Sequence, residues 1–122
     1  MHIASYNCVQ CVEAVEETRW HLFFDCPFSQ ACWLFLGINW NMNLDPLQMI
    51  ITAQQNFGNC TYREILILAC WSIWCHRNAI IFDNVSTSFS YWWSCFHKEL
   101  KLLTLRVKPA FADRIKTFMS SL

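Results

Sequence analysis

The chain of 122 residues is long enough to bury one core and fits a single domain. Its residues are 55% hydrophobic and 15% charged, with 7 Trp and 10 Phe, which excludes the composition of a disordered chain. The formal net charge is zero, so the chain as a whole carries no excess positive charge for a nucleic-acid backbone.

The first pattern along the chain is a set of four residues at metal-ligand spacing, Cys-x2-Cys-x9-His-x4-Cys. These residues are Cys8, Cys11, His21 and Cys26. Zn²⁺ prefers thiolate sulfur and imidazole nitrogen, and a structural zinc site takes four such ligands in a tetrahedron. We therefore predict a structural Zn²⁺ that holds the fold together and leaves no position for a substrate. The alternative is that these cysteines are ordinary small buried residues. The next ligand candidates are His2 and Cys32.

Two helices that open with proline are predicted next. The first covers residues 28–36, because Pro27 is tolerated at a first helical position and Gly37 is a plausible stop. The second is capped by Asp45 and ends at Gly58.

The third predicted helix, Tyr62 to about Phe82, is apolar nearly all round, which indicates a central helix buried on several sides. Thr61 and Glu64 have capping-box spacing at its start. Its apolar run is well short of the roughly 20 residues of a membrane span, so we expect no such span. The predicted core face is Leu66, Ala69, Cys70, Ile73, Trp74 and Arg77, and a second apolar face is Ile65, Leu68, Trp71, Ser72 and Cys75.

A fourth helix is predicted after the Asp83-Asn84 turn, with its cap among residues 86–88. Its apolar residues step by three or four positions, namely Trp92, Phe96, Leu100, Leu103 and Val107. Pro109 breaks this helix, and a short last helix is predicted over 110–119.

These elements predict a mostly α fold in which a small N-terminal zinc knuckle caps a bundle of four to five helices. We expect one domain over residues 1–122. Within it, residues 6–40 hold the knuckle and first helix, and residues 45–119 form the helical bundle.

Charge is divided unevenly between the two halves. Residues 1–60 carry one basic and five acidic side chains, a net charge of −4, and residues 61–122 carry eight basic and four acidic ones, a net charge of +4. A solvated helix face is the simpler interpretation of the late basic residues. The functional alternative is a surface for a partner or for nucleic acid. Its candidate residues are Lys98, Lys101, Arg106 and Lys108.

No catalytic set is recognisable, so we predict no enzyme. Cysteine and histidine lie close together at Cys75-His76 and at Cys95 and His97, but residues two apart on a helix do not face each other. We expect these histidines to be satisfied core or surface residues. Glu16-Glu17 is predicted to be a solvated turn, and two glycines cannot form a phosphate loop.

Eight cysteines raise the question of disulfides. The N-terminus has no basic stretch followed by an apolar one, and three cysteines belong to the metal pattern. We therefore expect a reducing intracellular compartment, the cytoplasm or the nucleus.

The motif chain over residues 6–98 resembles the zinc-binding domain that follows the polymerase in plant non-LTR (LINE-type) retrotransposon reverse transcriptases. In its first part the resemblance rests on Cys8-x2-Cys11, Glu16-Glu17-Thr18, Trp20-His21-Leu22-Phe23-Phe24-Asp25-Cys26-Pro27-Phe28-Ser29, Cys32-Trp33, Leu36-Gly37-Ile38 and Trp40. In its second part it rests on Trp71-Ser72-Ile73-Trp74-Cys75-His76-Arg77-Asn78-Ala79-Ile80-Ile81-Phe82. It implies a zinc-dependent module that helps to grip nucleic acid, here detached from its polymerase.

Two functions follow as hypotheses. The first is a non-catalytic, zinc-stabilised interaction module that binds a protein partner or itself, because abundant Trp and Phe supply interface anchors. The alternative is an RNA-binding or single-stranded-DNA-binding module, which the resemblance favours and the neutral charge disfavours. No small-molecule substrate is expected.

Overall fold

The computed structural model describes residues 7–11 and 15–122, which form one π-helical turn and five α-helices. Within these ranges the only extended pairing is an isolated antiparallel bridge between Asn7 and Glu16. The predicted mostly α fold, with a cysteine and histidine cluster ahead of a helical bundle, is confirmed. The elements are η1 (His21–Asp25), α1 (Pro27–Phe35), α2 (Pro46–Phe57), α3 (Tyr62–Phe82), α4 (Phe89–Thr104) and α5 (Pro109–Ser120).

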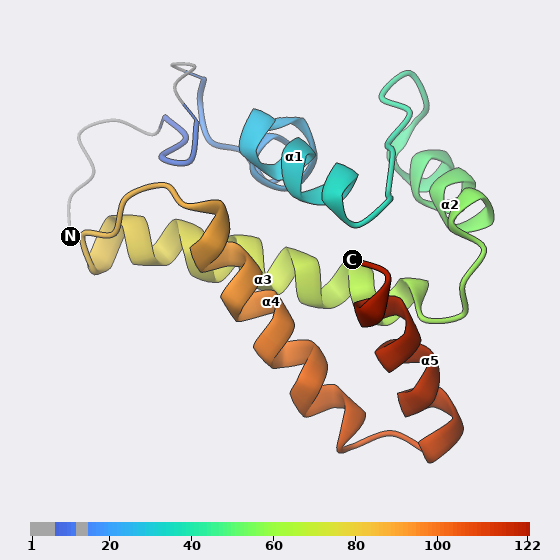
Figure 1. The fold of residues 1–122 in the computed structure, drawn as a ribbon. Helices are drawn as coiled ribbons and strands as arrows, with labels where there is room; N and C mark the ends of the chain where they lie inside the picture. The colour runs from blue at the N-terminus through green and yellow to red at the C-terminus, as the bar shows by residue number, and fades with distance from the viewer. Residues whose placement is uncertain (1–6, 12–14) are drawn as a thin grey trace.

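The long helix α3 organises the molecule (Figure 1). The helix α4 turns back along α3 and makes the most extensive helix–helix contact, and α5 returns against α4. Both η1 and α1 also pack on α3. The segment that contains the N-terminal cysteines lies beside the C-terminal end of α3, so the predicted ligands and the central helix are neighbours.

Most helix ends follow the predicted signals. The Asp45 carboxylate accepts a 3.1 Å hydrogen bond from the Gln48 N–H and caps α2. The residues Gly37 and Gly58 end α1 and α2 at φ values of 82° and 66°, where a side chain would be strained. At α4, Ser88 is the cap and accepts from the Tyr91 N–H.

The capping box at α3 was predicted wrongly. The Thr61 hydroxyl donates to the Asn59 side chain at 2.8 Å, and the Thr61 N–H donates to the same oxygen at 2.9 Å. The hydroxyl therefore does not cap the helix, and α3 begins without a side-chain cap. An Asx-type turn at Asn59 has replaced the predicted motif.

One continuous hydrophobic core joins the N-terminal segment to the bundle. The α4 periodicity predicted Trp92, Phe96 and Leu100 correctly as core residues, and all three are fully buried. The largest buried side chains are Trp33, Trp92, Phe96, Leu36, Ile38, Met49, Ile65, Ile73, Leu100 and Ile115.

The predicted apolar faces of α3 were wrong at Trp74 and at Trp71, which are 39% and 50% exposed, so the helix is not buried on that side. The buried face instead runs through Ile65, Ala69, Ile73, His76 and Ala79, with Tyr62 and Ser72 also buried. Because α3 is apolar all round, its periodicity does not reveal which side α4 covers.

By length and composition alone, α3 would be long and apolar enough to cross a membrane. One third of that stretch is buried by the rest of the protein, and the helix also carries Arg63, Glu64, His76 and Arg77. A core helix meets the same criterion, so the described residues contain no clear membrane span.

Candidate metal centre

The four predicted ligands converge. Their ligand atoms, one from each of Cys8, Cys11, His21 and Cys26, all lie within 4.8 Å of one another. The Cys8 and Cys26 sulfurs are 3.9 Å apart, and the Cys11 sulfur lies 3.4 Å from His21 Nε2. All but Cys11 are buried. This cluster can hold a metal ion, as the sequence spacing predicted.

A π-helical turn brings His21 and Cys26 to the same side. The Cys26 N–H donates to the His21 carbonyl at 2.6 Å, an i→i+5 bond. In an ordinary α-helix, residues five apart point about 140° away from each other. The wider turn reduces this angle, and π-turns are frequent at functional sites. No sequence signal predicts this turn, which precedes the predicted start of α1.

A carboxylate beside Nδ1 fixes the orientation of the His21 ring. Nδ1 lies 3.3 Å from the Asp25 carboxylate, which leaves Nε2 directed at the three sulfurs. Metal-binding histidines are commonly oriented in this way by a carboxylate. The i,i+4 spacing of Asp25 from His21 is the sequence signal for this contact.

The protein environment favours a thiolate at Cys26. The Cys8 thiol donates to the Cys26 sulfur, and the backbone N–H groups of Ser29 and Phe28, at the start of α1, point to it as well. These contacts lower the pKa of Cys26 below its ordinary value despite burial. For Cys8 the same contact favours the protonated thiol and raises its pKa. A bound cation would favour loss of that proton, because metals bind thiolates.

A buried histidine ties the cluster to the bundle. His76 is fully buried in α3 and donates from Nδ1 to the Gln10 side-chain oxygen at 2.8 Å. Its Nε2 accepts from the Ser88 N–H at 3.0 Å, and the Phe28 ring stacks on it at 4.4 Å. Both ring nitrogens are therefore satisfied, which confirms the reading of His76 as a core residue.

A second contact between the N-terminal segment and α3 corrects the prediction that Glu16-Glu17 is a solvated turn. The Glu17 carboxylate accepts two hydrogen bonds from Arg77, at 3.0 Å and 2.8 Å, and both side chains are largely buried. The Arg77 guanidinium also lies 4.8 Å from the centre of the Trp74 ring. Arg77 thus holds Glu17, which lies four positions before His21, against α3.

The remaining candidates lie outside the cluster. Cys32 is fully buried, and its burial raises the pKa of its thiol, as expected for a core cysteine. His2 lies outside the described residues. All eight cysteines are free thiols.

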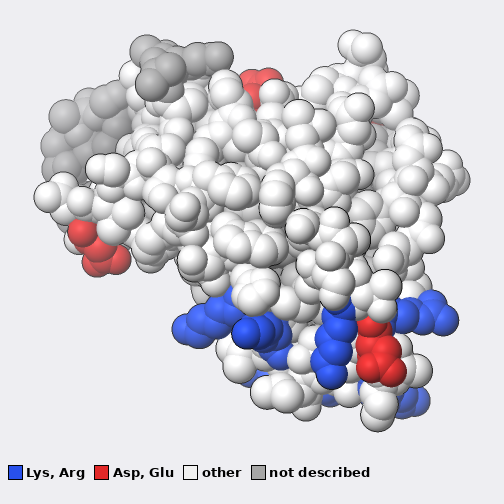
Figure 2. Space-filling model, in the orientation of Figure 1, with Lys and Arg blue, Asp and Glu red and all other residues white. Residues whose placement is uncertain are grey.

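Two of the four basic residues predicted to form a binding surface lie in one hollow. Lys98 and Lys101 line a shallow hollow of about 510 Å³ on α4, together with Trp93 and His97. The other basic residues lie beyond it, with Arg106 after the end of α4 and Lys108 directly before α5. Figure 2 shows Lys and Arg gathered over this lower end of the molecule, whereas the face above them is nearly uncharged.

Comparisons of the chain with protein-family models, with curated proteins and with solved structures found no match.

Proposed function

We propose that this protein is a non-catalytic, zinc-stabilised interaction module that binds a protein partner or a second copy of itself. The proposal has two parts, a structural metal and a binding surface. Each part is supported by its own residues and can be tested separately.

Zinc is the ion that the ligand set favours. With metal–sulfur bonds of about 2.3 Å and metal–nitrogen bonds of about 2.0–2.1 Å, a tetrahedral zinc site places two sulfurs about 3.8 Å apart and a sulfur and a nitrogen about 3.6 Å apart. The corresponding distances here are 3.9 Å for Cys8 to Cys26 and 3.4 Å for Cys11 to His21. Three thiolates and one imidazole also exclude ions that prefer oxygen.

A structural role suits this site better than a catalytic one. Four protein ligands fill a tetrahedron and leave no position for water or substrate. The buried histidine nearest the site, His76, already uses both ring nitrogens in hydrogen bonds within the protein. The zinc would supply folding energy by holding the N-terminal segment against α3.

The observation that carries the interaction function is an exposed apolar row on the central helix. Ile67, Trp71 and Trp74 succeed one another at spacings of four and three, so they share one face of α3. They are 53%, 50% and 39% exposed. We call these three residues the α3 stripe. Exposed Trp residues that cluster in this way are typical anchors of protein interfaces.

The test compares wild type with the Trp71→Ala, Trp74→Ala double variant as bait in an extract of the cells that express the protein. After cross-linking, proteins that bind the stripe should be captured by the wild-type bait and should be lost from the variant bait. The Leu105→Ala variant, which changes an apolar side chain that is 81% exposed on another part of the surface, should behave as wild type. Equal capture by all three baits would show that the stripe does not bind the captured proteins.

The resemblance to retrotransposon zinc-binding domains supports a second candidate, an RNA-binding or single-stranded-DNA-binding module. The observation in its favour is the hollow on α4, where Trp93 offers a ring for base stacking beside Lys98 and Lys101. Charge reversal at both lysines should then abolish a salt-dependent shift of a labelled oligonucleotide. Free thiols and a thiolate-bound zinc suit a reducing intracellular compartment, cytoplasm or nucleus.

A further inference from the structure

The α3 stripe has opposite charges at its two ends. Arg63 lies one helical turn before Ile67 on the same face and is exposed. At the other end, Glu17 binds Arg77, and Arg77 lies against Trp74, so the segment of residues 16 and 17 borders the stripe there. Neither Glu16 nor Arg63 forms an ion pair with another described residue.

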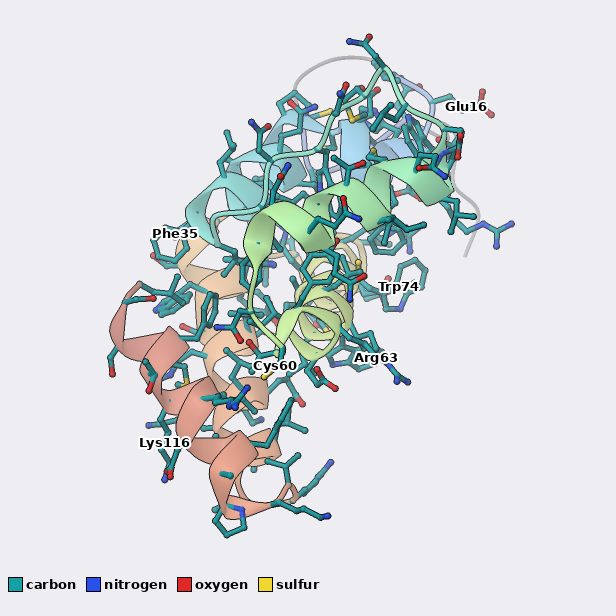
Figure 3. All side chains as sticks on the ribbon, turned by 90° about the vertical axis from the view of Figure 1, so that its right-hand side faces the viewer. Glu16, Phe35, Cys60, Arg63, Trp74 and Lys116 are labelled. Carbon is teal, nitrogen blue, oxygen red and sulfur yellow. The ribbon has the colours of Figure 1, made fainter. Side chains whose placement is uncertain are left out.

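Figure 3 views the molecule nearly along α3. Glu16, Trp74 and Arg63 lie on one side of the molecule, and Lys116 of α5 lies on the opposite side. The buried face of α3, which includes Ile65, Ala69 and Ile73, points away from the stripe toward α4 and the core. No described element therefore covers the stripe.

An apolar row with acid at one end and base at the other is complementary to itself when one copy is turned around. In a two-fold dimer the same patch is used twice, with residue i against j and j against i. A two-fold axis at Trp71 sets Ile67 of one copy opposite Trp74 of the other. It also brings Arg63 to the end of the stripe where Glu16 lies.

We propose that two copies of this chain associate through the α3 stripe in antiparallel orientation, with Trp71 at the two-fold axis and Arg63 facing Glu16 of the second copy. This inference rests on the proposed function and names the partner as the protein itself. Trp71 would be the anchor, because it is central and half of its surface is available for burial. The Arg63 and Glu16 contacts would set the orientation and contribute less affinity.

The test is sedimentation of the zinc-loaded full chain over a range from low to high micromolar concentration. Wild type should show a monomer–dimer equilibrium, and Trp71→Ala should raise its dissociation constant by about 30-fold or more. The matched control Leu105→Ala should leave it unchanged. A wild type that stays monomeric throughout, or a dimer that Trp71→Ala does not weaken, overturns the proposal.

Charge reversal tests the antiparallel orientation. Arg63→Glu and Glu16→Lys should each weaken the dimer by about 10-fold, because each change affects two symmetric contacts. The double variant should return to within a few-fold of wild type, whereas Lys116→Glu should have no effect. Two losses that simply add in the double variant would refute the pairing.

The same experiments separate this inference from the proposed function. A monomeric wild type whose Trp71→Ala, Trp74→Ala variant loses a captured protein would refute self-association and leave the interaction function intact. A monomer that sediments with phosphatidylcholine vesicles through the stripe would refute both.

Discussion

Gln10 and His76, 66 positions apart in the chain, meet in a buried 2.8 Å hydrogen bond. Gln10 lies between two cysteines of the metal cluster, and His76 lies in the central helix. Since His76 Nε2 accepts from Ser88, its Nδ1 must carry the proton that Gln10 accepts. The loop from Cys8 to Cys11, α3 and the residue that caps α4 are therefore fixed to one another through a single imidazole in a single tautomer.

Removal of the Gln10 side chain should destabilise the fold. In Gln10→Ala the buried Nδ1–H of His76 loses its acceptor, which costs about 1 to 3 kcal/mol of unfolding free energy. Urea unfolding of the zinc-loaded protein measures this loss. The control is Gln48→Ala on the exposed side of α2, for which a change within about 0.5 kcal/mol is expected. Equal stability of the two variants would show that the Gln10 contact is energetically neutral.

Stability should fall in mild acid because of His76. Burial lowers the pKa of His76 from 6.5 to about 4, since the charged form loses its hydration in the core. An imidazole whose pKa is lower in the folded state contributes stability above pH 6.5 that is lost as the pH falls toward 4. The loss is about 2 kcal/mol at pH 5 relative to pH 7.

The matched variant His76→Asn isolates this effect. The asparagine amide can still donate to Gln10 but does not titrate in this range. Acid also protonates the metal ligands, but this contribution is common to both proteins. The difference in unfolding free energy between wild type and His76→Asn should therefore shrink between pH 7 and pH 5. A constant difference would mean that His76 titrates normally in the folded state.

The sequence predicted the helices and the cluster of three cysteines and one histidine because both follow local rules. Gly37, Gly58, Asp45 and Ser88 act through neighbouring backbone, and the ligand set is defined by residue type and spacing. The π-turn at His21–Asp25 was not predictable in the same way, since no local residue preference separates it from an α-helical turn.

The sequence pattern could not predict the long-range contacts either. Glu17 and Arg77 are 60 positions apart, and nothing local marks one as the partner of the other. The wrong assignment of Trp74 to the core has a similar cause. On a helix that is apolar on every side, the face that becomes buried is decided by where α4 packs and not by the helix itself.

Two tryptophans should therefore differ sharply in their contribution to stability. Trp33 is 1% exposed, and its indole N–H donates to the Phe23 carbonyl at 2.6 Å. Trp33→Ala should cost about 3 to 5 kcal/mol, as large-to-small changes in a core do. Trp74→Ala removes an exposed ring and its contact with Arg77, and should cost about 1 kcal/mol or less. Denaturant unfolding at a low protein concentration measures the unfolding free energy of both variants. Similar losses would show that Trp74 contributes to stability as a core residue does.

Removal of the metal should unfold the N-terminal part of the chain first. Freshly purified, untagged protein should contain one zinc per chain, and a chelator or Cys8→Ser should remove it. Because binding energy in such sites is folding energy, the residues of η1 and α1 should lose their protection from hydrogen exchange. The C-terminal end of α3 should follow, since Gln10 and Glu17 would no longer be held against it.

The control for this experiment is Cys60→Ser, which changes an exposed thiol far from the cluster in sequence. It should keep its zinc and its exchange pattern. Helix α5, which packs on α4, should be the least affected by the chelator. Protein that contains no zinc when purified, or that keeps η1 and α1 protected after the metal is removed, would show that the four ligands do not hold the fold.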